Sequence, residues 1–470
     1  MNIVKKINSI SNISFILLLS ILSFLIWYLT TGHVLIHEPF VWDDLHLFRK
    51  YSLEEITNAW TGNWDPDNLE TPGYRPIVPL FYNFLGNIFN ENTFYLRLFI
   101  FLMAISLIVL VKICLIKIGF TKVEITIFSF LIIFSKIFTT LVAWMTMSVL
   151  ILSYITAFIS LIFFLLWLED KKIKNYLISL LFAFFSIFTK EDLYILPGLF
   201  FLFCLCLENN TFKKIKKIFY GCIPIGLLVL THIFLRKTFV SEAQHFEISF
   251  QSITFGGEVI GFGNLIKVFK ASFLPMGYFS SRNLDLFQSF ISIFWIILIL
   301  LISIINFLNR KKISLSSYKI LIFILLVALL SLPNITIARS FGIFLPSVFA
   351  LGIICILINN LVNLILNTEQ KLLIKKFYII FIFLLVSAGV IGGHIRSNQH
   401  INSMNSYSEH ILEYDIIFVY KYTKSSIPEK RLKKKIEHLK SLNINEWISK
   451  DEYKNLSNKI LFPKYHPLDF

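Results

Sequence analysis

The chain has few charged residues for its length. Of its 470 residues only 16% are Asp, Glu, Lys or Arg, while 56% are hydrophobic. Soluble globular domains carry about 25% charged residues, so the composition excludes an ordinary soluble protein. Apolar stretches near the ~20 residues needed to cross a bilayer recur as far as Gly393. The sequence therefore predicts an all-α integral membrane protein.

Cysteine is also scarce, and its positions exclude a disulfide framework. The five cysteines lie in apolar segments, and none is spaced with a histidine as a metal site would require. No predicted outer loop, where a disulfide would be expected, contains a cysteine. The cysteines are therefore expected to fill the core.

Basic residues exceed acidic ones, giving a formal net charge of +15. Such an excess can indicate nucleic-acid binding. Here, however, Lys and Arg gather at the ends of apolar stretches, where they orient helices and contact lipid headgroups. We therefore expect contact with membrane lipids and no nucleic-acid partner.

About eleven membrane-spanning helices are expected in residues 1–393, followed by a soluble tail over residues 394–470. The first span is interpreted as a retained helix, because no signal-peptide cleavage site follows it. The predicted spans are 13–31, 93–116, 123–142, 147–168, 175–189, 193–207, 216–235, 288–308, 318–333, 341–366 and 372–393.

The positive-inside rule orients this bundle. With Lys5 and Lys6 inside, alternate loops are rich in Lys and Arg, whereas the short loops of opposite parity hold only Lys136, Lys190 and Arg339. The N-terminus is therefore predicted in the cytoplasm and the tail outside, in a bacterial inner membrane. Two long outer loops are expected, at about 32–92 and about 237–287.

Two adjacent carboxylates, Asp43 and Asp44, follow Trp42 in the first outer loop. A charge at the bilayer centre costs about 2.5–3.5 kcal/mol even on lenient scales, so this pair should lie at the water boundary. There one carboxylate could act as a general base toward a hydroxyl, or both could bind a divalent cation. They could equally cap a helix within the loop.

The segment Tyr74-Arg75-Pro76 closes the same loop, where the chain re-enters apolar sequence. An arginine held rigidly near the headgroups suits bidentate hydrogen bonding to a phosphate. The simpler interpretation is an interfacial arginine that extends its charged end to water.

Lys190, Glu191 and Asp192 lie between two short apolar spans, and Arg339 is the only charge between two later ones. Charges are too costly in mid-membrane to be unpaired. The first group is therefore a surface turn with paired charges or the lining of a polar cavity. Arg339 could contact lipid phosphate in general. The predicted topology puts all four motifs on the outer face, which suits an anionic lipid-linked substrate.

The order of these motifs resembles the C-type (GT-C) membrane glycosyltransferases, in particular the protein O-mannosyltransferase-like and tetratricopeptide-linked enzymes. The resemblance lies in an acidic motif after the first helix, a Tyr-Arg-Pro segment closing the first loop, a Lys-Glu pair before a helix with a proline, and an Arg-led string ending in Pro346-Ser347. It covers nearly the whole membrane body. The chain departs from the family by having Ser340 and Phe341 in place of the string's tyrosines, and by having a tail too short for repeats.

The resemblance implies a GT-C-like bundle that transfers a sugar from a polyprenyl-phosphate carrier, for which we expect undecaprenyl phosphate. The acceptor would be a glycan, a lipid-linked saccharide or a protein on the outer face. Asp43 or Asp44 would be the general base. The donor phosphate would be held by Arg75, Lys190 and Arg339, with Trp42, Tyr74, Glu191 and Asp192 in support. No cofactor is assigned, and the need for a divalent cation is left open.

Two alternatives use the same membrane body. A transporter or flippase of lipid-linked saccharide would carry polar groups at the midplane and repeated halves. No such halves are evident, and the spans 93–116, 147–168, 288–308 and 372–393 lack ionisable residues in their middles. A glycan polymerase or ligase would place decisive basic residues in a late outer loop, as Lys267, Lys270 and Arg282 could be.

Overall fold

The computed structural model describes residues 12–37, 47–48, 50–62, 64, 74–89, 92–207, 212–240, 254–255, 258–259, 268–269, 271–274, 294–297, 300, 304, 314–332, 343–367, 380–399 and 401. Within these ranges the chain is almost wholly helical, apart from one short antiparallel pair, β1 (Thr254–Phe255) with β2 (Glu258–Val259). Most of the predicted span 288–308, of the second outer loop and of the tail lies outside the described residues.

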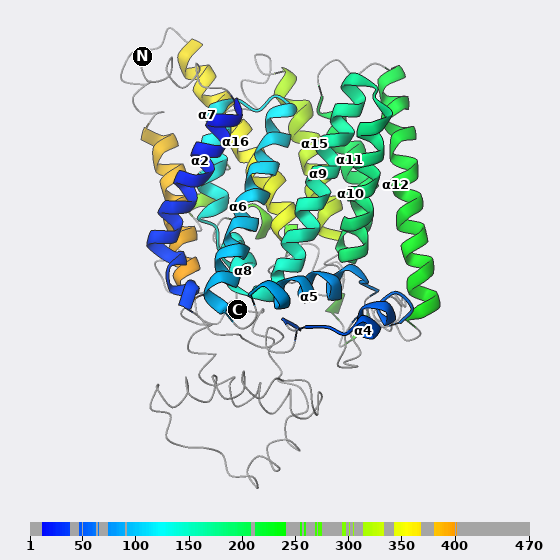
Figure 1. Ribbon diagram of the computed structural model, residues 1–470. Coiled ribbons are helices and arrows are strands. Elements are labelled where there is room, and N and C mark those ends of the chain that lie inside the picture. Colours follow the sequence, from blue (N-terminus) through cyan, green and yellow to red (C-terminus); the bar gives the residue numbers. More distant parts are fainter. Residues whose placement is uncertain are drawn as a thin grey trace, which may run out of the picture.

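The helices form a bundle whose long members stand side by side (Figure 1). In chain order they are α2 (Asn12–Trp27) with η1 (Tyr28–Gly32) and η2 (Val34–His37), α4 (Leu53–Asn58), α5 (Ile77–Phe89), α6 (Thr93–Lys117), α7 (Lys122–Ile133), α8 (Lys136–Ala143), η3 (Met145–Met147), α9 (Ser148–Asp170), α10 (Ile173–Thr189), η4 (Glu191–Ile195), α11 (Leu196–Leu205), α12 (Phe212–Phe239), α15 (Ser314–Ser331) and α16 (Phe344–Asn367). A last helix covers Ile380–Gln399.

Six helices of the described chain are long and apolar enough to cross a membrane, or seven if the bent pair α7–α8 counts as one span. α10, α11 and the apolar part of α15 are shorter. Large apolar side chains are exposed on α2, α6, α10 and α12, as expected of helices that face lipid. The prediction of an all-α membrane protein is confirmed, and the number of eleven spans stays a prediction.

Packing inside the bundle is tight and apolar. α9 packs against α6 and α10, and α16 packs against α7 and α15. All five cysteines are free thiols buried in the bundle, which confirms that they fill the core.

The predicted single span 123–142 is in fact broken. α7 ends at Ile133, and α8 starts at Lys136 at an angle of 56°. The Ser135 side chain accepts a hydrogen bond from the Phe138 amide and so begins a new helix. The last helix packs on this break so closely that a Cβ on Gly393 would collide with the Phe134 carbonyl oxygen.

The predicted end of the last span, at Gly393, was too early. The helix continues to Gln399, because polar side chains beyond Gly393 find partners in the bundle. His394 Nδ1 lies 2.9 Å from the Thr31 hydroxyl, and the Ser397 hydroxyl accepts a hydrogen bond from Thr139 at 2.9 Å. Sequence hydropathy falls here, but the helix does not end.

Two helices of the first predicted outer loop lie at one end of the bundle. α5 runs across the bundle and α4 lies beside it, at the lower end in Figure 1. α5 buries Val78, Tyr82 and Leu85, and the Tyr82 hydroxyl donates to the Thr146 carbonyl at 3.0 Å. α4 begins with a capping box between Ser52 and Glu55. We call this end of the bundle the α5 end.

Candidate functional site

The turn between α10 and α11 brings charged residues to the α5 end. α10 ends at Thr189, and Lys190 is extended, with φ −155° and ψ 127°. Glu191 then starts the 3-10 helix η4, and Pro197 lies in the first turn of α11, where a missing amide hydrogen costs nothing. The backbone therefore holds Glu191 and Asp192 in a short rigid connection.

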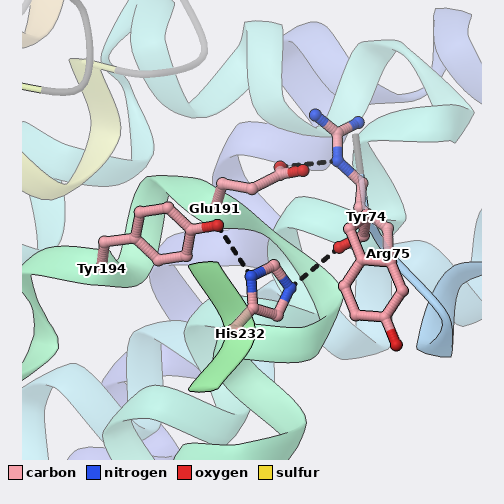
Figure 2. A network of polar contacts seen from close by, with 5 residues as sticks. All are labelled: Tyr74, Arg75, Glu191, Tyr194 and His232. Carbon is pink, nitrogen blue, oxygen red and sulfur yellow. Dashed lines mark hydrogen bonds and ion pairs between the residues drawn. The ribbon is translucent and has the colours of Figure 1, made fainter. Parts of the chain in front are cut away.

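The central contact of the site is an ion pair between Arg75 and Glu191. Arg75 Nε donates to Glu191 Oε2 at 2.7 Å, and the two side chains are 23% and 9% exposed. The two terminal nitrogens of Arg75 point away from Glu191 (Figure 2) and make no hydrogen bond to a described residue. The guanidinium also lies over the Trp64 ring, 5.6 Å from its centroid. Among the described residues, Arg75 is thus held by the Nε edge of its guanidinium, and its two terminal nitrogens lie on the opposite side.

Cations surround the Glu191 carboxylate. Burial alone would raise the pKa of Glu191, but the positive charges of Arg75, Lys190 and Arg236 outweigh it and lower the pKa to about 2. Burial alone would likewise lower the pKa of Arg75, but Glu191 and Asp192 raise it above its ordinary value. Glu191 is therefore an ionised acceptor and Arg75 a permanent cation.

A buried histidine of α12 forms hydrogen bonds to both of the chain segments that carry this ion pair. His232 is fully buried; its Nε2 lies 2.8 Å from the Tyr74 carbonyl, and its Nδ1 lies 2.7 Å from the Tyr194 hydroxyl (Figure 2). A carbonyl only accepts, so Nε2 must carry the hydrogen. In the neutral ring Nδ1 is then the acceptor, and Tyr194 donates to it.

Aromatic contacts fix the end of the first loop beside this network. The Tyr74 hydroxyl donates to the Trp60 carbonyl at 2.9 Å, and its ring packs edge-on against His232 and Phe188. Tyr74 is 1% exposed. The residue immediately before Arg75 is therefore anchored on both sides, which restricts where the guanidinium can lie.

The structure brings together some of the sequence-predicted site residues. Arg75 and Glu191 are in direct contact, Tyr74 precedes the pair, and Lys190 and Asp192 lie within electrostatic range of it. The remaining predicted residues, Trp42, Asp43, Asp44 and Arg339, lie outside the described residues. Among the residues that are described, no cluster of three or more His, Cys, Asp or Glu could hold a metal ion.

Sequence reasoning missed the contribution of α12. His232 and its partner Tyr194 lie in the predicted apolar spans 216–235 and 193–207, and Arg236 lies one residue beyond the first of these. The available signal was the pair His232 and Arg236, one helical turn apart in an apolar stretch, since ionisable residues inside a membrane segment usually face a functional interior.

Fold and site together define a helical membrane protein with a buried polar network at one end of its bundle. The structure is similar to archaeal oligosaccharyltransferase AglB from Archaeoglobus fulgidus in complex with an inhibitory peptide and a dolichol-phosphate, with a TM-score of 0.47 and 12% identity over 82% of this chain and 56% of that chain. It is similar also to the apo crystal structure of the Archaeoglobus fulgidus oligosaccharyltransferase, with a TM-score of 0.46 and 9% identity over the same shares.

The chain thus spans little more than half the length of these two proteins. No protein-family model and no curated protein matches it. The narrower resemblance to protein O-mannosyltransferase-like enzymes stays a prediction from the sequence motifs.

Proposed function

We propose that the chain is a membrane glycosyltransferase that moves a sugar from a polyprenyl-phosphate carrier to an acceptor at the outer membrane face. The observation that carries the proposal is the placement of Arg75, which contacts Glu191 and Trp64 while its two terminal nitrogens make no hydrogen bond to a described residue. Two parallel N–H groups in a fixed plane are the donors that bind a phosphate bidentately.

The position of this guanidinium fits a lipid-linked donor. It lies at the α5 end of an apolar bundle, where a carrier chain could remain among lipids while its phosphate reaches Arg75. Cleavage of the bond between sugar and phosphate increases the negative charge on the phosphate oxygens. A preorganised cation lowers the free energy of that transition state without having to reorganise. Lys190 and, in this proposal, Arg339 add to the same field.

The acceptor hydroxyl would lose its proton to Asp43 or Asp44. In this proposal the α5 end faces outward, the N-terminus is cytoplasmic, and the membrane is a bacterial inner membrane. The carrier is undecaprenyl phosphate, and the acceptor is a glycan, a lipid-linked saccharide or a protein.

Transfer assays with Arg75 variants test the role of the guanidinium. Membranes containing the wild type should transfer sugar from at least one polyprenyl-phosphate sugar in a panel. Arg75→Lys keeps the charge but loses the planar pair of donors, so we expect the donor KM to rise by about tenfold, the equivalent of about 1.4 kcal/mol. Lys117→Arg, at a partly exposed position on α6, is the control and should change nothing. An unchanged KM in Arg75→Lys would remove Arg75 from phosphate binding.

A further inference from the structure

The ion pair Arg75–Glu191 is part of a closed network of contacts, whose other members have no direct part in the proposed transfer. Tyr74 precedes Arg75 in the chain, and Tyr194 lies three residues after Glu191 on η4. Both are bonded to the same imidazole, that of His232 (Figure 2). The closed network therefore runs from Arg75 through Glu191, Tyr194, His232 and Tyr74 back to Arg75.

We propose that His232 is a positioning residue that sets the orientation of Arg75 toward the donor phosphate. The inference rests on the proposed function for its consequence in catalysis, but the geometry itself does not depend on it. Arg75 lies just before α5, and Glu191 lies in the connection between α10 and α11. Without a common support, their relative position would depend on one salt bridge with a partly exposed member.

His232 suits this role because α12 is a long helix that packs against both α10 and α11, the two helices that flank Glu191. The imidazole is fully buried and lies edge-on to Phe188 at 4.8 Å between centroids. Among the described residues, its Nε2 hydrogen bonds to the Tyr74 carbonyl and its Nδ1 lone pair accepts from Tyr194, so turning the imidazole over would break both bonds. Buried polar groups that lose one partner are costly, which keeps the arrangement in place.

The two bonds can be separated by substitution. In His232→Gln the amide nitrogen reaches about as far as Nε2 and can still donate to the Tyr74 carbonyl. In His232→Asn the shorter amide reaches only toward Tyr194, and His232→Ala loses both bonds. Tyr194→Phe removes the hydroxyl while leaving the Tyr74 bond intact. Leu230→Ala, on the exposed face of the same helix, is the matched control.

Amide hydrogen exchange of the segment 74–82, measured in nanodiscs, tests the geometry without any substrate. We expect exchange to become about two- to tenfold faster in His232→Ala and His232→Asn, because both lose the hydrogen bond to the Tyr74 carbonyl. His232→Gln should stay near the wild type, as should Leu230→Ala. Tyr194→Phe keeps the Tyr74 bond, as His232→Gln does, so it should also stay near the wild type, and His232→Asn serves where His232→Ala fails to insert. Equal exchange in all His232 variants would overturn the inference.

Donor kinetics test the consequence. His232→Ala should raise the KM for the polyprenyl-phosphate sugar by about five- to tenfold while changing kcat less, and His232→Gln should rescue the KM. A fall in kcat alone that Gln does not rescue would contradict a positioning role. If exchange responds as expected but the wild type transfers sugar from no donor, the proposed function fails while the positioning by His232 stands.

Discussion

The Arg75–Glu191 pair should contribute strongly to stability, and its contribution can be worked out from the structure. Glu191 is 9% exposed and its pKa is lowered from 4.5 to about 2. A pKa lowered this far corresponds to about 3 kcal/mol, of which Arg75 supplies the largest part and Lys190 and Arg236 supply smaller parts. Arg75 is 23% exposed, so solvent screens part of the interaction, and we expect a coupling free energy of about 2–3 kcal/mol.

A double-mutant cycle measures this coupling. Arg75→Gln, Glu191→Gln and the double variant would be unfolded reversibly in mixed micelles at pH 7, and the free energies of unfolding compared. Arg75→Gln alone should be the most destabilising change, because it leaves a buried carboxylate whose Oε1 already has no hydrogen-bond partner among the described residues. The double variant should recover part of the loss.

The control is an ion pair of similar length in a different environment. Lys117 and Glu169 lie 3.0 Å apart with side chains 34% and 54% exposed. Their coupling should be under about 1 kcal/mol. A coupling for Arg75–Glu191 no larger than that of the control would refute the reasoning, because burial would then not strengthen the pair.

Three further outcomes follow from the described residues. The stabilisation by Glu191 should be fully present above pH 4.5 and lost as the pH falls from 4.5 toward 2, because protonation removes a charge that only the folded state favours. The free energy of unfolding, measured at each pH, should show this dependence in the wild type and not in Glu191→Gln. Gly393→Ala should lower the free energy of unfolding by about 1–3 kcal/mol through its clash with the Phe134 carbonyl. Gly226→Ala, with open space around its Cβ, should instead stabilise by up to about 1 kcal/mol, and equal effects at both glycines would contradict the packing described here.

Much of the bundle could be predicted because a membrane helix has a strong local signal. The spans 93–116, 147–168 and 175–189 agree with α6, α9 and α10 to within a few residues. What hydropathy could not predict depends on contacts between distant segments. The break before Lys136 needs the last helix packed on it, and the extension beyond Gly393 needs Thr31 and Thr139 as partners.

The site was partly predictable for a related reason. Charges that interrupt apolar sequence stand out, so Arg75 and Glu191 could be singled out without knowing that they touch. His232 and Tyr194 could not be assigned a role, because their function depends on which carbonyl and hydroxyl the fold brings to the imidazole. A histidine in an apolar helix could form hydrogen bonds with many different partners, and the sequence alone does not show which of them the fold brings to it.

The most direct test of the central claim is sugar transfer by membranes containing wild-type, Asp43→Asn and Asp44→Asn proteins, supplied with polyprenyl-phosphate sugars. We predict transfer by the wild type and its loss in one of the two variants, with the protein inserted at the normal level, because only one carboxylate serves as the base. Transfer unchanged in both variants would remove these aspartates from the chemistry. No transfer by the wild type from any donor would contradict the glycosyltransferase itself.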